Sequence, residues 1–267
     1  MRTALSFLLI LALVAPGFAG DDATTQPLRI GDAVPAFELP TLDGGTFSLA
    51  DARAVTEEKA LADVIAAAGG GELNAESTLA SVATLGDDAA KIRALLVKVG
   101  QPHGLIPAAD AAENVETIGD VATWVAESAN APMVFMCWSP MCPTSRGYED
   151  RIQALVAEYG ARFYPLASNS PEKERDEDCV QYVKDRELPY RVLLDREQKA
   201  CDIFGGKVTP HVFGVDAEGR LAYAGSIDSD PRCQIESSDD RTNWLADALE
   251  ALLDERPVDV LLTTPKG

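Results

Sequence analysis

The sequence lacks the features that mark several functional classes. It contains neither a C-x2-C pair nor an H-x3-5-H tract, which are the ligand spacings typical of zinc sites. Basic residues are also scarce, with 23 Lys and Arg against 43 Asp and Glu and a formal net charge of −20. Such a chain has few groups to neutralise phosphates, so we expect no nucleic acid partner. We interpret the excess of acids as a solvated surface.

Long apolar runs are absent after the first residues. Arg2 is followed by an apolar run at 4–14 and then by Pro16-Gly17-Phe18-Ala19. Small residues at 17 and 19 fit a cut after Ala19, so residues 1–19 are predicted to be a secretory signal peptide, with retention as a membrane anchor as the alternative. No later run approaches the roughly 18 to 20 apolar residues of a membrane span. We therefore expect a periplasmic or secreted, extracytoplasmic protein.

Cysteines are few for a chain of this length. The five, at positions 137, 142, 179, 201 and 233, cannot form an extensive disulfide scaffold. Their odd number leaves at least one thiol outside any intramolecular bridge. In an oxidising compartment such a thiol is either buried and inert or reactive for a reason.

The order of patterns along the chain predicts one α/β domain with an insert. Residues 28–50 read as a short hairpin with a turn at Asp43-Gly44-Gly45. Residues 51–130 are alanine-rich with apolar positions at helical spacing, such as Ile92, Leu95, Leu96 and Val99, and predict a helical insert.

Strands and helices alternate from residue 131 onward. A buried strand "APMVFMCW" precedes a helix over 146–160, and two further strand–helix pairs follow. A hairpin built from "PHVFGVD" and "GRLAYAGS" and a helix over 240–255 come next, before a tail at 256–267. This order predicts a mixed central sheet with helices on both faces.

The segment "MCWSPMCPTSRGYED" carries the strongest chemical signal. Cys142 lies where a strand ends and a helix begins, with Pro143 as a favoured first-turn residue. Unpaired N–H groups and the positive end of the helix stabilise a thiolate there, so we expect a lowered pKa for Cys142. Cys137 lies within the apolar strand, and we interpret it as a structural cysteine.

Three segments resemble the thioredoxin-like redoxin family, which includes alkyl hydroperoxide reductase and thiol-specific antioxidant proteins, and in particular its secreted thioredoxin-domain members. They are "IGDAVPAFELPTLDGGTFSLAD", "VFMCWSPMCPTSRGYEDRI" and "VTPHVFGVDAEGRLAYAGSID". The resemblance covers 28–50 and 131–255 and implies a thioredoxin-like fold with antioxidant or other oxidoreductase activity. It makes Cys142 the attacking cysteine and Pro210 the cis-proline beside it, with Thr209 open to pair with a substrate backbone.

This sequence departs from the family at two sites. Thioredoxin-type oxidoreductases place a resolving cysteine three residues after the first, where this chain has Ser145. Family peroxidases surround the cysteine with a proline, a hydroxyl residue and an arginine. Ser139 supplies the hydroxyl, but Phe135 and Pro210 stand in place of the proline and the arginine.

Other residues are candidates for supporting roles. By its position, Cys179 resembles the resolving cysteine of some atypical thiol peroxidases, and Cys137 is a second candidate. His211, next to Pro210, could tune the site, although we interpret it as structural. Cys201 is expected to be buried on a helix face, and Cys233 to be exposed in a loop.

Three functions follow from these expectations. In the first, Cys142 thiolate attacks a protein disulfide, and an external thiol restores it. In the second, the same thiolate reduces hydroperoxides through sulfenic acid. In the third, the fold binds a soft metal such as copper through Cys137 and Cys142 without turnover. The first two require no cofactor.

Overall fold

The computed structural model describes residues 26–56, 59–60, 62–64, 89–108, 110–116, 118–128, 131–168 and 172–267. The predicted signal peptide lies outside these residues. Within the described ranges, no helix combines the length and the apolar character that a membrane span requires.

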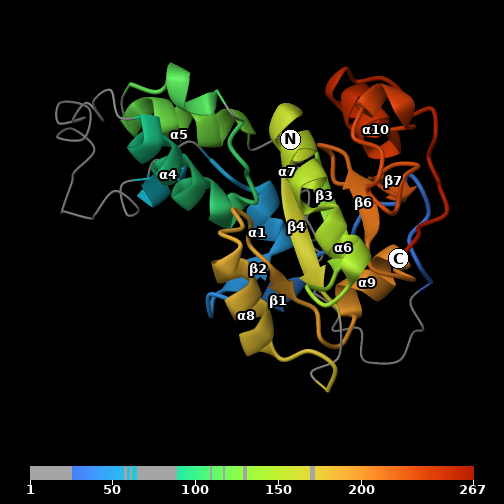
Figure 1. Cartoon of the computed structure of the whole chain (residues 1–267). Helices are drawn as coiled ribbons and strands as arrows, with labels where there is room; N and C mark the ends of the chain where they lie inside the picture. Colours follow the sequence, from blue (N-terminus) through green and yellow to red (C-terminus); the bar gives the residue numbers. More distant parts are fainter. Residues whose placement is uncertain are drawn as a thin grey trace, which may run out of the picture.

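The centre of the molecule is a five-stranded sheet in the order β5-β4-β3-β6-β7 (Figure 1). β3, β4 and β5 run parallel, while β6 is antiparallel to β3 and β7 is antiparallel to β6. The strand bounds are β3 Met133–Trp138, β4 Arg162–Ala167, β5 Leu193–Leu194, β6 His211–Val215 and β7 Leu221–Gly225. A separate antiparallel hairpin joins β1 Glu38–Pro40 to β2 Thr46–Ser48, as the sequence predicted.

Successive side chains of β3 point to opposite faces of the sheet and contribute to the apolar cluster on each face. All six of its residues are buried, because Val134, Met136 and Trp138 enter one apolar cluster and Phe135 and Cys137 enter the other. Strands buried on both faces read as continuous apolar runs, which is why "MVFMCW" shows no alternation of polar residues.

Helices cover both of these faces. The face of Trp138 carries α7 Glu149–Glu158, α8 Asp176–Asp185 and α10 Trp244–Leu253. The face of Cys137 carries α9 Lys199–Phe204, α1 Leu49–Arg53 and the β1–β2 hairpin. The predicted mixed sheet with helices on both faces is therefore confirmed, and its strand order and directions are those of the thioredoxin-like fold.

The helix predicted at 146–160 is divided in two. α6 Pro143–Gly147 starts directly after Cys142, and α7 follows after Tyr148. The buried Tyr148 hydroxyl donates to Asp228, Oη···Oδ1 2.6 Å, so the junction between the helices is fixed to the loop after β7.

The described part of the predicted insert is mostly helical. It contains α4 Ala89–Gly100, η1 Gln101–His103, η2 Ala111–Asn114 and α5 Ile118–Glu127. Ile92, Leu96 and Val99 lie in an apolar cluster of their own, with Leu95 packed partly buried against it. A β-bridge between Leu105 and Arg162 joins this unit to β4, and the Tyr164 hydroxyl donates to His103 O at 2.6 Å. The boundaries at 51 and 130 stay a prediction.

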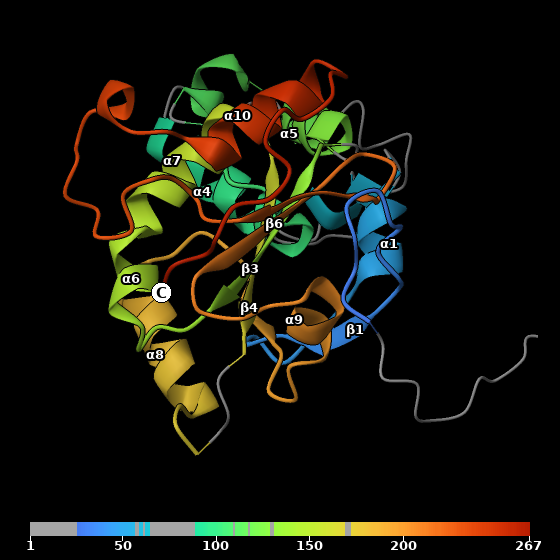
Figure 2. The same ribbon diagram turned by 90° about the vertical axis from the view of Figure 1, so that its right-hand side faces the viewer.

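The C-terminal tail runs along β7. Ala224 pairs with Leu262 in a parallel bridge, and Thr263 N donates to Ala224 O at 3.1 Å. The Thr263 hydroxyl lies 2.7 Å from Tyr223 Oη and accepts from Ser226 N at 2.8 Å. Glycine at 225 permits this approach, because a Cβ there would collide with Thr263. The chain ends beside α6, as both views show (Figures 1 and 2).

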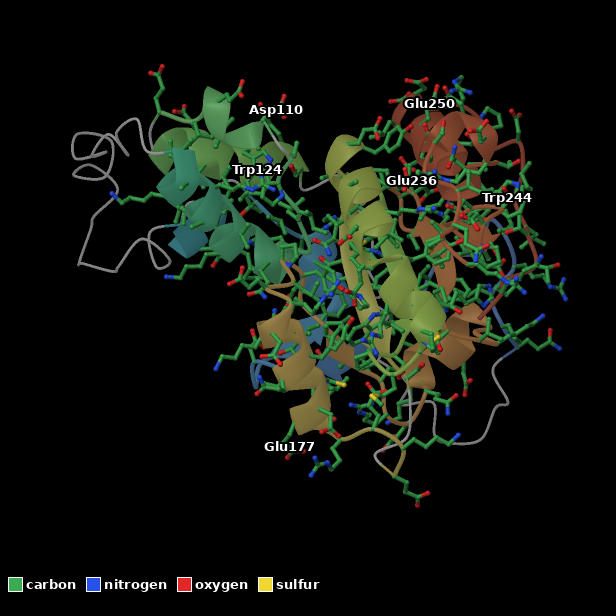
Figure 3. All side chains as sticks on the ribbon, viewed as in Figure 1. Asp110, Trp124, Glu177, Glu236, Trp244 and Glu250 are labelled. Atoms are coloured by element: carbon green, nitrogen blue, oxygen red, sulfur yellow. A yellow bond between two sulfur atoms is a disulfide. The ribbon has the colours of Figure 1, made fainter. Side chains whose placement is uncertain are left out.

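Acidic side chains are distributed over the surface. Asp110, Glu177, Glu236 and Glu250 are exposed and come from four separate segments (Figure 3). This arrangement agrees with the interpretation of the negative charge as a solvated surface.

Candidate active site

Cys142 is held at the start of α6 by local backbone hydrogen bonds. Its N–H donates to Ser139 O at 3.1 Å, and its own carbonyl accepts from Arg146 N at 3.1 Å. Cys142 is the N-cap residue, with extended backbone angles and Pro143 at the first helical position. The chain therefore leaves β3, turns at Ser139 to Met141 and presents a half-buried thiol at the helix start.

The cis-proline segment lies directly against this thiol. The peptide bond between Thr209 and Pro210 is cis, as the sequence predicted. The Cys142 thiol donates to the Thr209 carbonyl oxygen, Sγ···O 2.9 Å. Cys142, Thr209 and Pro210, which are distant in sequence, therefore meet at one end of the central sheet.

Several groups around Cys142 favour its ionised form. Burial alone would raise the pKa of Cys142, but the Thr209 side chain, the backbone N–H and side chain of Ser145, and the backbone N–H of Thr144 lower it below its usual value. The buried Ser145 hydroxyl lies beside the sulfur and is one of the groups that lower this pKa. Because α6 has only five residues, these local donors matter more than a long helix dipole.

His211 is buried beside the site but does not suit proton transfer at neutral pH. Burial, and to a lesser degree Lys207, lowers the pKa of His211 to about 4. Its ring packs on Phe213 with centroids 4.3 Å apart. The neutral, packed ring supports the structural interpretation.

Ser139 helps to fix the loop that presents Cys142. Its buried hydroxyl accepts from Met141 N at 3.1 Å and donates to Glu174 Oε2 at 3.0 Å. Glu174, also buried, accepts from the Cys179 thiol through its other oxygen at 2.9 Å. The two contacts with Met141 and Glu174 let Ser139 position the loop. A catalytic role for Ser139 stays a prediction.

Cys179 is a buried thiol with a strongly perturbed environment. Burial, followed by the Glu174 carboxylate, raises the pKa of Cys179 to about 12. Arg196 Nη2 lies 3.2 Å from the sulfur and also pairs with Asp176. A resolving role for Cys179 stays a prediction, and it requires that this thiol leave Glu174 and ionise.

Cys137 is bonded to Cys201 in a disulfide, with Cα atoms 6.0 Å apart. Strand alternation directs Cys137 toward α9, where Cys201 is buried as predicted. The interpretation of Cys137 as structural agrees with this bond, and its candidate role as resolving partner of Cys142 stays a prediction that requires the bond to Cys201 to be reduced first. Copper binding by Cys137 together with Cys142 fails while this bond is intact, because a disulfide sulfur offers no thiolate ligand.

Two further findings were not expected from the sequence. Cys233 is not fully exposed but packs partly buried, with its sulfur 3.4 Å from the place a Cβ on Gly147 would take. The tail reaches the site, since a Cβ on Gly267 would overlap the Thr209 carbonyl oxygen and lie 3.1 Å from Val208 Cβ. Gly267 therefore lies at the edge where the family resemblance places a substrate.

The fold is similar to two solved structures: an uncharacterised conserved protein from Geobacillus kaustophilus and a hypothetical protein from Sinorhizobium meliloti 1021. Each has 16% identity, a TM-score of 0.53, and coverage of 90% of this chain and 94% of the other. A thioredoxin domain of a thiol-disulfide oxidoreductase from Bacteroides vulgatus matches with 12% identity and a TM-score of 0.40, over 77% of this chain and 94% of that domain. No protein-family model and no curated protein matches. At these identities the similarity shows the fold, and the chemistry has to be argued from the residues.

Proposed function

We propose that the protein is an extracytoplasmic thiol-disulfide oxidoreductase in which the Cys142 thiolate attacks a disulfide of a protein substrate. One observation carries this proposal. The half-buried Cys142 thiol has a lowered pKa and lies 2.9 Å from the carbonyl that precedes cis Pro210. A reactive thiol requires both a stabilised thiolate and access to it, and Cys142 has both.

The reaction proceeds by exchange of sulfur bonds. Cys142 thiolate attacks one sulfur of the substrate disulfide, a mixed disulfide forms, and the second substrate sulfur leaves as a thiolate. Because Ser145 stands where a resolving cysteine would be, an external thiol attacks the mixed disulfide and releases reduced Cys142. The reductant is thus a partner of the cycle.

A second candidate function is the reduction of hydroperoxides. Here the Cys142 thiolate attacks the peroxide O–O bond, becomes a sulfenic acid and releases an alcohol or water, and two equivalents of external thiol then reduce it. The position of the C-terminus against Thr209 favours this candidate, because a small peroxide need not displace the tail. Against it, the hydrogen-bond partners of Cys142 Sγ in the described part of the chain include no arginine.

Intact-mass spectrometry with thiol counting separates the two candidates. Protein with Cys142 reduced and the Cys137–Cys201 disulfide intact receives a stoichiometric pulse of hydrogen peroxide or of hydroxyethyl disulfide, alongside Cys142→Ser and the matched control Cys233→Ser. Exchange predicts a mixed disulfide that only Cys142→Ser abolishes. Peroxidase activity predicts rapid oxygen addition with the same dependence. Reaction that persists in Cys142→Ser would overturn both candidates.

A further inference from the structure

The Cys137–Cys201 disulfide lies on the wall of a cavity of about 280 Å³, which we call the disulfide cavity. The remaining lining residues are mostly polar or glycine, and they are Ser168, Lys173, Gln198, Gly206, Lys207, Val208 and Thr209. A disulfide that serves only to stabilise a core is expected to be enclosed by apolar side chains. This one lies in the apolar cluster of the Cys137 face on one side and borders a polar space that is open to solvent on the other.

The charge of the disulfide cavity is opposite to that of the chain. Lys173 and Lys207 are exposed at the cavity, and no Asp or Glu is among the described residues that line it. In a chain of net charge −20, two lysines at the mouth form a local positive site, while the buried Asp195 carboxylate lies behind the disulfide and accepts from Cys201 N at 2.8 Å. The charge of Lys207 also reaches His211, whose pKa it helps to lower after the larger effect of burial. An anionic small molecule is therefore the occupant that this cavity favours.

Access to the disulfide is restricted to small reagents. Cys137 and Cys201 are only 2% and 3% exposed, so a protein thiol could not reach them without rearrangement of the fold. On one side the Gly206 backbone lies so close that a Cβ there would be 2.6 Å from Cys137 Sγ. The cavity volume falls just below the roughly 300–1,000 Å³ of pockets for drug-sized ligands, which suits a ligand of few atoms.

We propose that the Cys137–Cys201 disulfide is a second redox site, which exchanges with a low-molecular-weight anionic thiol bound in the disulfide cavity between Lys173 and Lys207. The thiolate attacks one cystine sulfur, the Cys137–Cys201 bond breaks, and the other cysteine leaves as a thiolate. A second thiolate attacks the mixed disulfide and leaves as the small-molecule disulfide. The two protein thiolates take up protons from water, so two thiols reduce one protein disulfide to a dithiol.

This site is separate from Cys142 in chemistry but adjacent to it in space. Thr209 lines the disulfide cavity, and its carbonyl oxygen accepts the Cys142 thiol hydrogen bond. The proposal does not depend on the proposed function of Cys142, because the disulfide exchanges with thiols whether or not Cys142 reacts.

The test uses the full chain in its oxidised form with Cys142→Ser, so that Cys142 chemistry cannot contribute. A non-reducing peptide map first establishes the 137–201 link. The protein is then treated under native conditions with 3-mercaptopropionate, 2-mercaptoethanol or cysteamine. These are small thiols that carry, besides the thiol, a negatively charged carboxylate, a neutral hydroxyl and a positively charged ammonium group, respectively. Alkylation at timed intervals, followed by peptide mass spectrometry, gives the rate of appearance of Cys137 and Cys201 thiols, and each rate is divided by the thiolate concentration.

We expect the anionic thiol to react about tenfold faster per thiolate than the cationic one, with the neutral thiol between them and the difference reduced by salt. Lys207→Gln combined with Lys173→Gln should remove most of this preference. Lys98→Gln, an equal charge change on α4 outside the cavity, should preserve it. Equal rates for the three thiols, no reduction under native conditions, or a map without the 137–201 link would each overturn the proposal.

Discussion

Ser139 and Cys179 are joined through a single buried carboxylate, since both donate hydrogen bonds to Glu174. The loop that presents Cys142 is thereby fixed to α8. Glu174→Gln keeps an acceptor for Ser139 but removes the charge that helps to raise the pKa of Cys179. We expect Cys179 to become more reactive toward iodoacetamide at pH 9, and peptide mass spectrometry measures this. The exposed Glu177→Gln on α8 is the control, and an unchanged Cys179 would mean that burial alone suppresses it.

The raised pKa of Cys179 also makes the free energy of unfolding depend on pH in the alkaline range. Its pKa of about 12 in the folded protein exceeds the roughly 8.5 expected in the unfolded chain. The contribution of the protonated thiol is therefore complete below about pH 8.5 and is lost as the pH rises toward 12. Cys179→Ala should lose less stability than wild type between pH 8.5 and 10 in urea unfolding. Parallel losses in the two proteins would contradict this assignment.

The lowered pKa of Cys142 is testable through its alkylation rate. We expect the pH midpoint for reaction with iodoacetamide to be lower in the folded protein than in the same chain unfolded in urea. Thr209→Val removes a group that lowers this pKa and should move the midpoint upward. The matched variant Thr144→Val keeps the backbone N–H that acts on Cys142 and should leave the midpoint near that of wild type. A native midpoint equal to the unfolded one would exclude an activated thiol.

The fold and the centre of the site were predictable because their signals are local. The apolar run of β3 indicated a buried strand, and Cys142-Pro143 marked a helix start. Glu174 could not be singled out, since nothing in its local sequence distinguishes a buried glutamate among 43 acidic residues. The Cys137–Cys201 bond requires knowledge that α9 packs on the Cys137 face of the sheet, which is a tertiary fact that no spacing encodes.

The disulfide should contribute to stability as well as to chemistry. It joins positions separated by 64 residues, and restricting a loop of that length in the unfolded chain is worth about 4 kcal/mol. We expect Cys137→Ala with Cys201→Ala to lower the free energy of unfolding by up to this amount, measured by urea denaturation. Wild type reduced with dithiothreitol should show a similar loss. A loss below about 1 kcal/mol would show that the bond constrains the unfolded chain little.

Removal of the tail should open the site to large reagents. A chain ending at Pro257 lacks the segment that lies against Val208 and Thr209. We expect a polymer-linked maleimide to label Cys142 several-fold faster in this variant, while iodoacetamide reacts at nearly the wild-type rate. Thr263→Val removes the hydroxyl that contacts Tyr223 and Ser226 and should give a smaller change of the same sign. Equal acceleration for both reagents would indicate general loosening instead of release of a steric barrier.

The place where the chain ends has a practical consequence for laboratory work. Any affinity tag fused after Gly267 would start beside the Thr209 carbonyl oxygen, which accepts the Cys142 thiol hydrogen bond. A histidine-rich tag there would bring metal-binding imidazoles to a thiol whose metal and oxidant reactions are under study. Purification handles, fluorophores and surface attachment are therefore better placed away from this edge of the sheet, so that the surroundings of the Cys142 thiol stay unchanged.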